Sequence, residues 1–138
     1  MKSSYWQIEQ LPRLNKGNQE QLKSLGINNT EVLLNSTKTQ AQKQSLANQL
    51  KSPVQLINKW VALADLARVP IVGCDYCGLI LHSGIISVKQ LAQTSVSSLH
   101  RQILKLQVAT LQRQDLCPSP DVVQTWINEA KKLLIIDN

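Results

Sequence analysis

The fold is decided by a repeated stretch, VPIVGCDYCGLILHSGIISVKQLA (69–92), which follows the pattern of LPRLNKGNQEQLKSLGINNTEVLL (11–34) at a constant offset of 58 residues. Identical residues align at this offset: Pro12 with Pro70, Gly26 with Gly84, Ile27 with Ile85 and Leu33 with Leu91. Similarity at one fixed spacing indicates an internal repeat, in which each copy is one supersecondary unit. We therefore expect two related structural units within the 138 residues.

A second pair of similar segments follows the first pair. LINKWVALA (56–64) matches VVQTWINEA (122–130), with Trp60 aligned to Trp126, but the offset is now 66 residues. The larger offset indicates an insertion of eight residues before the later segment. The predicted organisation is an N-terminal segment (1–9), a first unit (10–67) and a second unit (68–138).

Start and stop signals predict helices throughout both units. Gly26 can end a short helix in a left-handed turn, and Asn29 and Ser87 occupy equivalent positions that can cap the next helix. Ser87 with Gln90 forms a capping-box pattern. No long alternating run of apolar and polar residues indicates a strand.

The later helix of each unit begins at a serine followed by a proline, with the proline at the first helical position: Ser52–Pro53 and Ser119–Pro120. Apolar residues spaced three and four apart predict the buried faces of these helices. They are Ile57, Trp60, Val61 and Ala64 in the first, and Val123, Trp126, Ile127, Ala130 and Leu134 in the second. A further helical stripe contains Leu104, Val108 and Leu111.

The order of elements resembles the helix-hairpin-helix motif, in which a hairpin of the form apolar–x–Gly–apolar–Gly joins two helices. LARVPIVGCDYCGLILHSGI (66–85) and IEQLPRLNKGNQEQLKSLGI (8–27) carry this resemblance. The layout also resembles a small uncharacterised bacterial family with a domain of unknown function, whose two units each end in a Trp-containing helix. The resemblance implies an all-α fold in which two repeated helix-hairpin-helix units pack as one compact helical domain, and it implies no enzyme activity.

In the wider superfamily the hairpin holds duplex DNA, because glycine allows close approach to a phosphate and helix N-terminal N–H groups donate to it. Both hairpins depart from that pattern. Arg13 and Asn15 replace both glycines of the first hairpin, while Ile71 replaces one glycine of the second and only Gly73 remains. Since Asn tolerates the left-handed conformation, we expect Asn15 to preserve the first turn. Asp75 would repel a phosphate at the second.

Two functions stay open at this point. The first is a non-catalytic interaction scaffold or assembly factor with degenerate hairpins, for which the candidate protein contacts are Ile71, Trp6 and Tyr5. The alternative is sequence-nonspecific DNA or RNA binding through hairpin amides and nearby cations. Its candidate residues are Arg13, Asn15, Lys16, Lys59, Arg68 and Gly73.

Cys74 and Cys77 form a C-x-x-C pair, which can bind a metal or act in redox chemistry. A structural zinc site needs about four ligands, and Cys117 and the two histidines form no second close pair. We expect Cys77 to be a buried small side chain and Cys74 to be partly exposed at a helix start. We expect no metal, no cofactor and no enzyme activity, since the acidic residues are isolated.

The formal net charge of +6 is compatible with nucleic acid, an anionic membrane surface or an acidic protein partner. No apolar stretch approaches the roughly 20 residues that span a bilayer, and the N-terminal sequence MKSSYWQIEQLPR has no apolar signal-peptide core. We therefore expect a cytoplasmic protein that does not insert into membranes.

Overall fold

The computed structural model describes residues 3–111 and 118–137. Within these ranges the chain forms one 3-10 helix, η1, and eight α-helices, and it forms no named strand. They are η1 (Ile8–Gln10), α1 (Lys16–Ser24), α2 (Thr30–Asn35), α3 (Gln40–Leu50), α4 (Val54–Leu66), α5 (Gly73–His82), α6 (Val88–Gln93), α7 (Val96–Leu111) and α8 (Pro120–Asp137). The predicted all-α class is confirmed for these residues.

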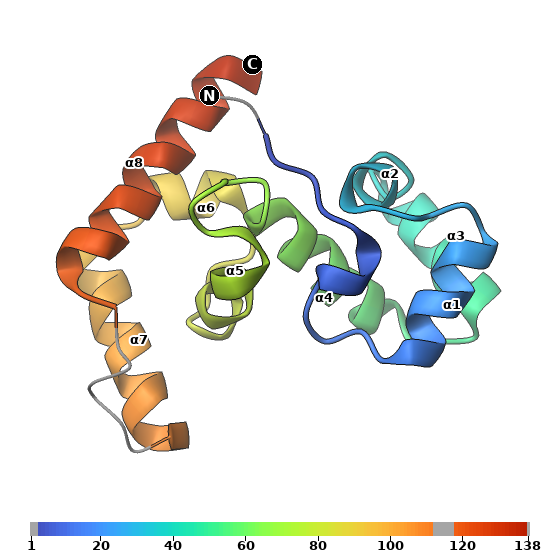
Figure 1. The fold of residues 1–138 in the computed structure, drawn as a ribbon, viewed down its shortest axis with the longest axis horizontal. Helices are drawn as coiled ribbons and strands as arrows, with labels where there is room; N and C mark the ends of the chain where they lie inside the picture. Colours follow the sequence, from blue (N-terminus) through green and yellow to red (C-terminus); the bar gives the residue numbers. More distant parts are fainter. Residues whose placement is uncertain (1–2, 112–117, 138) are drawn as a thin grey trace.

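The helices pack in two groups that meet at α4. Helices α2 and α3 pack on α4, whereas α6 and α7 pack on α8, and α4 also packs on α5 (Figure 1). One cluster of buried apolar side chains extends through both groups, from Ile8 in η1 to Leu133 in α8. Helix α4 is therefore the element through which the two groups share a core.

Short polar side chains begin two of the helices as the sequence predicts. At the start of α2, Asn29 Oδ1 accepts a hydrogen bond from the Val32 N–H at 2.9 Å. At the start of α6, Ser87 Oγ accepts one from the Gln90 N–H at 3.1 Å. Gly26 follows α1 with a φ of +81°, a conformation that glycine adopts at little cost.

Two predicted helix starts differ in detail. The Gln90 side chain accepts a hydrogen bond from the Ile86 N–H and not from Ser87, so the predicted capping box is only half formed. Pro53 is the N-cap of α4 in an extended conformation, and it is not the first helical residue. By contrast, Pro120 is the first residue of α8, as predicted.

The two tryptophans aligned by the repeat are both in the core. Trp60 is 0% exposed and Trp126 is 1% exposed, which confirms their prediction as core residues. Val61, Leu104 and Leu134 were also expected to be buried, but each is only half-buried. The side chains of two further predicted core residues lie outside the described part of the chain: Val108 and Leu111.

The N-terminal segment is hydrogen-bonded to α2 and to the turn that follows α4. The Trp6 N–H donates to Thr30 Oγ1 at 2.9 Å, and the Thr30 N–H donates to the Trp6 carbonyl at 2.9 Å. The indole Nε1 of Trp6 donates to the Ala67 carbonyl at 2.7 Å, and the Ser4 N–H donates to the Arg68 carbonyl at 2.8 Å. The segment therefore ties the first group of helices to the start of the second.

The close approach of Trp6 to Gly73 generates a prediction about stability. Gly73 has a φ of +53°, and a Cβ at this position would lie 3.1 Å from Trp6 Cζ2. We expect Gly73→Ala to lower the free energy of unfolding by about 1–3 kcal/mol, because the left-handed backbone and the indole both oppose a side chain. Urea unfolding followed by circular dichroism measures the change.

Gly78→Ala is the matched control in the same helix. A Cβ at Gly78 would lie 3.8 Å from Pro12 Cγ, an ordinary contact, and its φ is not positive. Replacing a helical glycine by alanine is expected to leave stability unchanged or raise it by up to about 1 kcal/mol. Equal losses in the two variants would contradict the special role of Gly73.

Candidate interaction surface

The tip of the first hairpin lies on α5. The Arg13 guanidinium contacts Nε2 of His82, and the ring of Pro12 lies beside Gly78. Arg13 has a φ of +72°, which is uncommon for a residue other than glycine. The tip whose Arg13 was a candidate phosphate contact therefore packs against α5 of the same chain.

The expectation that Asn15 takes the left-handed conformation is wrong. Asn15 has a φ of −80° and caps α1, because its Oδ1 accepts a hydrogen bond from the Asn18 N–H at 2.8 Å. An N-cap residue requires an extended backbone, so its capping role excludes the left-handed turn. Arg13 takes that conformation instead, two residues earlier.

The second hairpin is partly covered by the N-terminal segment. Gly73 is buried, and the indole of Trp6 occupies the side on which its Cβ would project. A phosphate therefore cannot approach Gly73 from that side. The candidate protein contacts Ile71 and Tyr5 are 40% and 45% exposed, whereas Trp6 is half-buried and bonded within the chain.

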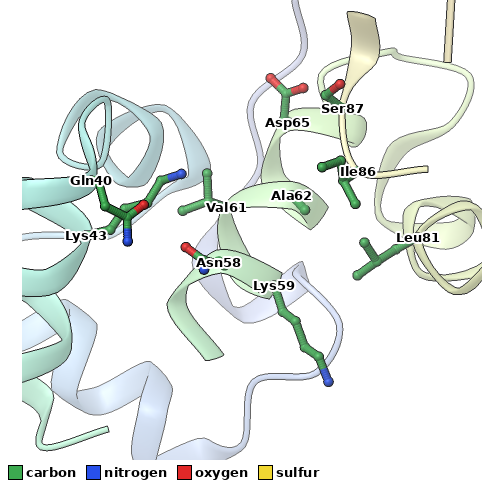
Figure 2. A pocket seen from close by; sticks show the side chains of 10 residues that line it. All are labelled: Gln40, Lys43, Asn58, Lys59, Val61, Ala62, Asp65, Leu81, Ile86 and Ser87. Atoms are coloured by element: carbon green, nitrogen blue, oxygen red, sulfur yellow. The ribbon is translucent and has the colours of Figure 1, made fainter. Parts of the chain in front are cut away.

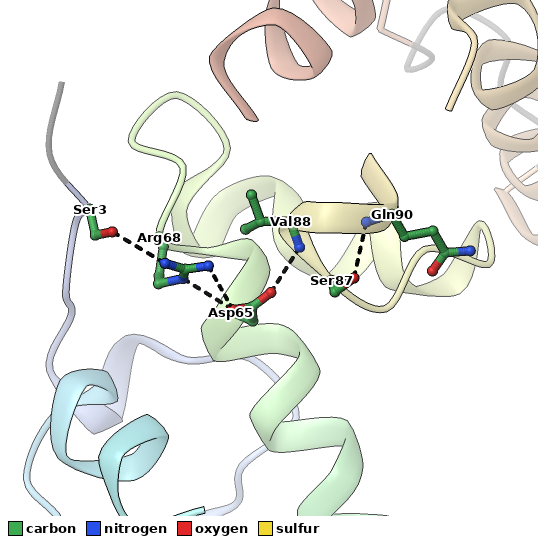
Figure 3. Close-up of polar contacts among 6 residues, drawn as sticks. All are labelled: Ser3, Asp65, Arg68, Ser87, Val88 and Gln90. Atoms are coloured by element: carbon green, nitrogen blue, oxygen red, sulfur yellow. Dashed lines mark hydrogen bonds and ion pairs between the residues drawn. The ribbon is translucent and has the colours of Figure 1, made fainter. Parts of the chain in front are cut away.

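Arg68 was also a candidate phosphate contact, but its guanidinium binds side chains of the same chain (Figure 3). Its Nη2 and Nε lie 3.0 and 3.1 Å from Asp65 Oδ1, and its Nη1 donates to Ser3 Oγ at 3.4 Å. Asp65 Oδ2 accepts a hydrogen bond from the Val88 N–H at 2.8 Å. The pair thus links α4 to the N-terminal segment and to the start of α6.

Cationic side chains gather near the end of α5. Partial burial, followed by the nearby charges of Arg13 and Lys59, lowers the pKa of His82 below its usual value of 6.5. Lys16, the first residue of α1, is exposed. Among the described residues no carboxylate forms an ion pair with Arg13, Lys16 or Lys59. Arg13 and Lys59 therefore give the end of α5 positive charge that the described carboxylates leave unpaired.

A groove of about 630 Å³ lies over α4, between α3 on one side and α5 with the start of α6 on the other (Figure 2). In Figure 2, Lys43 extends from α3 toward Val61, and Leu81 and Ile86 lie on the opposite side beyond Ala62. The groove is lined by Gln40, Lys43, Asn58, Lys59, Val61, Ala62, Asp65, Leu81, Ile86 and Ser87. Its lining combines the apolar side chains of Val61, Leu81 and Ile86 with two lysines and with Asp65.

Of the residues that line the groove, only Lys59 was named from the sequence as a candidate contact, and the groove itself was not predicted. One signal was readable in the adjacent pair Ile85–Ile86, because neighbouring residues before a helix cannot both face one core. Ile85 is 6% exposed and Ile86 is 62% exposed. The exposure of Val61 also follows from its position in the groove.

The cysteine pair lies in the first half of α5. Cys77 is buried and Cys74 is half-buried, as predicted. Burial, with a smaller contribution from Asp75, raises the pKa of Cys74 to about 11, and burial raises that of Cys77 to about 12. In the described ranges no group of three or more His, Cys, Asp or Glu side chains could hold a metal ion. Cys117 lies outside the described residues.

These features define an all-helical protein with an open groove over its central helix. The chain belongs to the family described as Domain of unknown function (DUF4332), whose model matches residues 12–133. Neither a curated protein nor a solved structure matches the chain. In residues 3–111 and 118–137, no helix has both the length and the apolar character needed to cross a bilayer.

The raised thiol pKa values generate a second prediction. At about pH 8 a thiol with a pKa near 11 is ionised to roughly one part in a thousand, against about a quarter for an ordinary thiol. In a Cys117→Ser variant, we expect iodoacetamide to modify Cys74 slowly and Cys77 only after unfolding. Mass spectrometry of timed samples, with and without denaturant, measures both rates. Rapid labelling of either thiol in the native protein would contradict this expectation.

The lowered pKa of His82 generates a third prediction. Because the folded state holds the proton less tightly than the unfolded state, the free energy of unfolding should fall as the pH drops below about 6.5. His82→Gln should remove this component of the fall, whereas His100→Gln should retain it. Denaturant unfolding between about pH 8 and pH 5 measures the dependence. An unchanged pH profile in His82→Gln would contradict the lowered pKa of His82.

Proposed function

We propose that the chain is a non-catalytic scaffold of two related helix-hairpin-helix units that binds a protein partner in the cytoplasm. In this proposal the hairpins are retained as architecture and do not hold phosphates. The observation that carries the proposal is that both hairpins pack against parts of the same chain. Pro12 and Arg13 lie on α5, and Gly73 lies under Trp6.

The helix boundaries support two related units. Helices α2 (Thr30–Asn35) and α6 (Val88–Gln93) have the same length and begin 58 residues apart, as in the sequence alignment. Helices α4 and α8 begin 66 residues apart, at Val54 and Pro120. In each half the two preceding helices pack on the last one: α2 and α3 on α4, and α6 and α7 on α8.

The positions of the candidate phosphate contacts also favour a scaffold. A phosphate clamp needs an accessible backbone next to unpaired cations. Gly73 is buried and Arg68 is paired with Asp65, so the second hairpin lacks both features. In the first hairpin Asn15 uses its side chain to cap α1.

The alternative function, nonspecific binding of DNA or RNA, draws its support from the exposed cations Arg13, Lys16 and Lys59. Such binding would depend on counterion release, so its affinity would fall steeply with salt. This dependence separates it experimentally from recognition of a protein.

A nuclease-controlled pull-down tests the proposed function. The tagged full chain is incubated with lysate of its source cells, with and without nuclease, and a duplex of about 30 bp is titrated by gel shift from about 50 mM salt upward. We expect the same proteins to be recovered in both lysates and no shift of the duplex. Recovery that disappears after nuclease treatment, together with a salt-sensitive shift, would overturn the scaffold in favour of nucleic-acid binding.

A further inference from the structure

We propose that the groove over α4 binds an amphipathic helix of a partner protein, and that this helix carries acidic side chains where it meets Lys43 and Lys59. This inference rests on the proposed function, because it names the site and the chemistry of the partner. It assigns the binding to the groove and not to the hairpin tips.

The groove gathers apolar side chains from three places in the chain that the described residues leave uncovered. Ile86 is 62% exposed, and Val61 and Leu81 are half-buried, although all three line one hollow. Burial of such apolar surface favours binding in proportion to the area removed from water. A partner with an apolar stripe would therefore gain free energy by filling the groove.

The surroundings of the groove favour a helix as the occupant. The floor and one wall belong to α4 and α3, whose backbone groups are paired within each helix, so an extended peptide finds no sheet edge to join. An amphipathic helix presents side chains at i, i+3, i+4 and i+7, and such ridges pack against a helix face with the same spacing. The face of α4 in the groove has that spacing: Asn58, Val61, Ala62 and Asp65.

The charges of the groove favour an acidic partner. The carboxylate of Asp65 is paired with Arg68, whereas no carboxylate of the described chain pairs with Lys43 or Lys59. The charge of Lys59 also acts on His82, where it disfavours protonation. Carboxylates brought by a partner would meet unpaired positive charge at Lys43 on the α3 side of the groove and at Lys59 on α4 (Figure 2), which gives specificity and faster association.

A second copy of the chain is a poorer occupant. The chain has a formal net charge of +6, so two copies would repel each other as they associate. The same positive charge would attract a segment that carries negative charge. The net positive charge of the whole chain therefore favours the same kind of partner as the two lysines of the groove, a segment with acidic side chains.

A peptide selection tests the inference with a defined probe. A random library of peptides about 16 residues long, enough for about four helical turns, is displayed against the full chain. We expect the selected sequences to share apolar residues spaced three and four apart and to contain more Asp and Glu than Lys and Arg. Selected peptides are then synthesised and titrated by fluorescence anisotropy.

Variants of the groove give the quantitative readout. Ile86→Glu should weaken binding at least about tenfold, because it places a carboxylate in the apolar contact. The double variant Lys43→Glu with Lys59→Glu should weaken the binding of an acidic peptide about tenfold. It should strengthen the binding of a version of that peptide in which Lys replaces Asp and Glu.

Matched controls separate these effects from general changes in charge or folding. Ile135→Glu alters an isoleucine that is 76% exposed on α8. The double variant Lys105→Glu with Lys131→Glu reverses the charge at two exposed positions, one on α7 and one on α8. Neither residue lines the groove. Both controls should bind the peptides as the unmodified chain does, and circular dichroism should show the same helix content in every variant.

Several outcomes would overturn the inference. They are selected peptides without helical spacing or acidic residues, binding that survives Ile86→Glu, and a selection that yields no binder dependent on Ile86. Dimers in sedimentation that Ile86→Glu abolishes would assign the groove to a second copy. If the inference fails while the pull-down still recovers a nuclease-resistant protein, the proposed function stands and its site lies elsewhere.

Discussion

Trp6 joins the N-terminal segment to two distant parts of the chain, the turn between α4 and α5 and the start of α2. Its indole N–H donates to the carbonyl of Ala67 just after α4, its ring covers Gly73 at the start of α5, and its backbone pairs with Thr30 at the start of α2. These contacts meet at the turn between α4 and α5, so they constrain how the two groups of helices are oriented. The groove over α4 depends on that orientation, because its walls come from both groups.

Groups that were candidate phosphate contacts are engaged within the chain at this turn and at the end of α5. Once Trp6 lies on Gly73, the close approach that glycine permits is used within the protein. Arg13 crosses to His82, and Arg68 pairs with Asp65, so polar groups that could have met a ligand join segments of the chain. A buried or partly buried pair of this kind orients its elements, whatever its net contribution to stability.

Much of the helical architecture was predictable because its signals are local. Asn29 caps α2 through a hydrogen bond to a residue three positions away, and Trp60 and Trp126 lie on apolar faces defined by helical spacing. Helix α3 was not specifically predicted, although Thr39 and Gln42 form a reciprocal capping box that marks its start. That error was a missed local signal and not a limit of the sequence.

Other features could not be read from local patterns. By itself the sequence determined the helical class, several helix starts and part of the core, including Trp60 and Trp126, because spacing and capping act within a few positions. Only the tertiary structure decided that Arg13 contacts α5, that Arg68 also reaches the N-terminal segment, and that Ile86 helps to form a groove. Each depends on segments brought together by packing, and their distances from one another are not encoded in any single stretch of the chain.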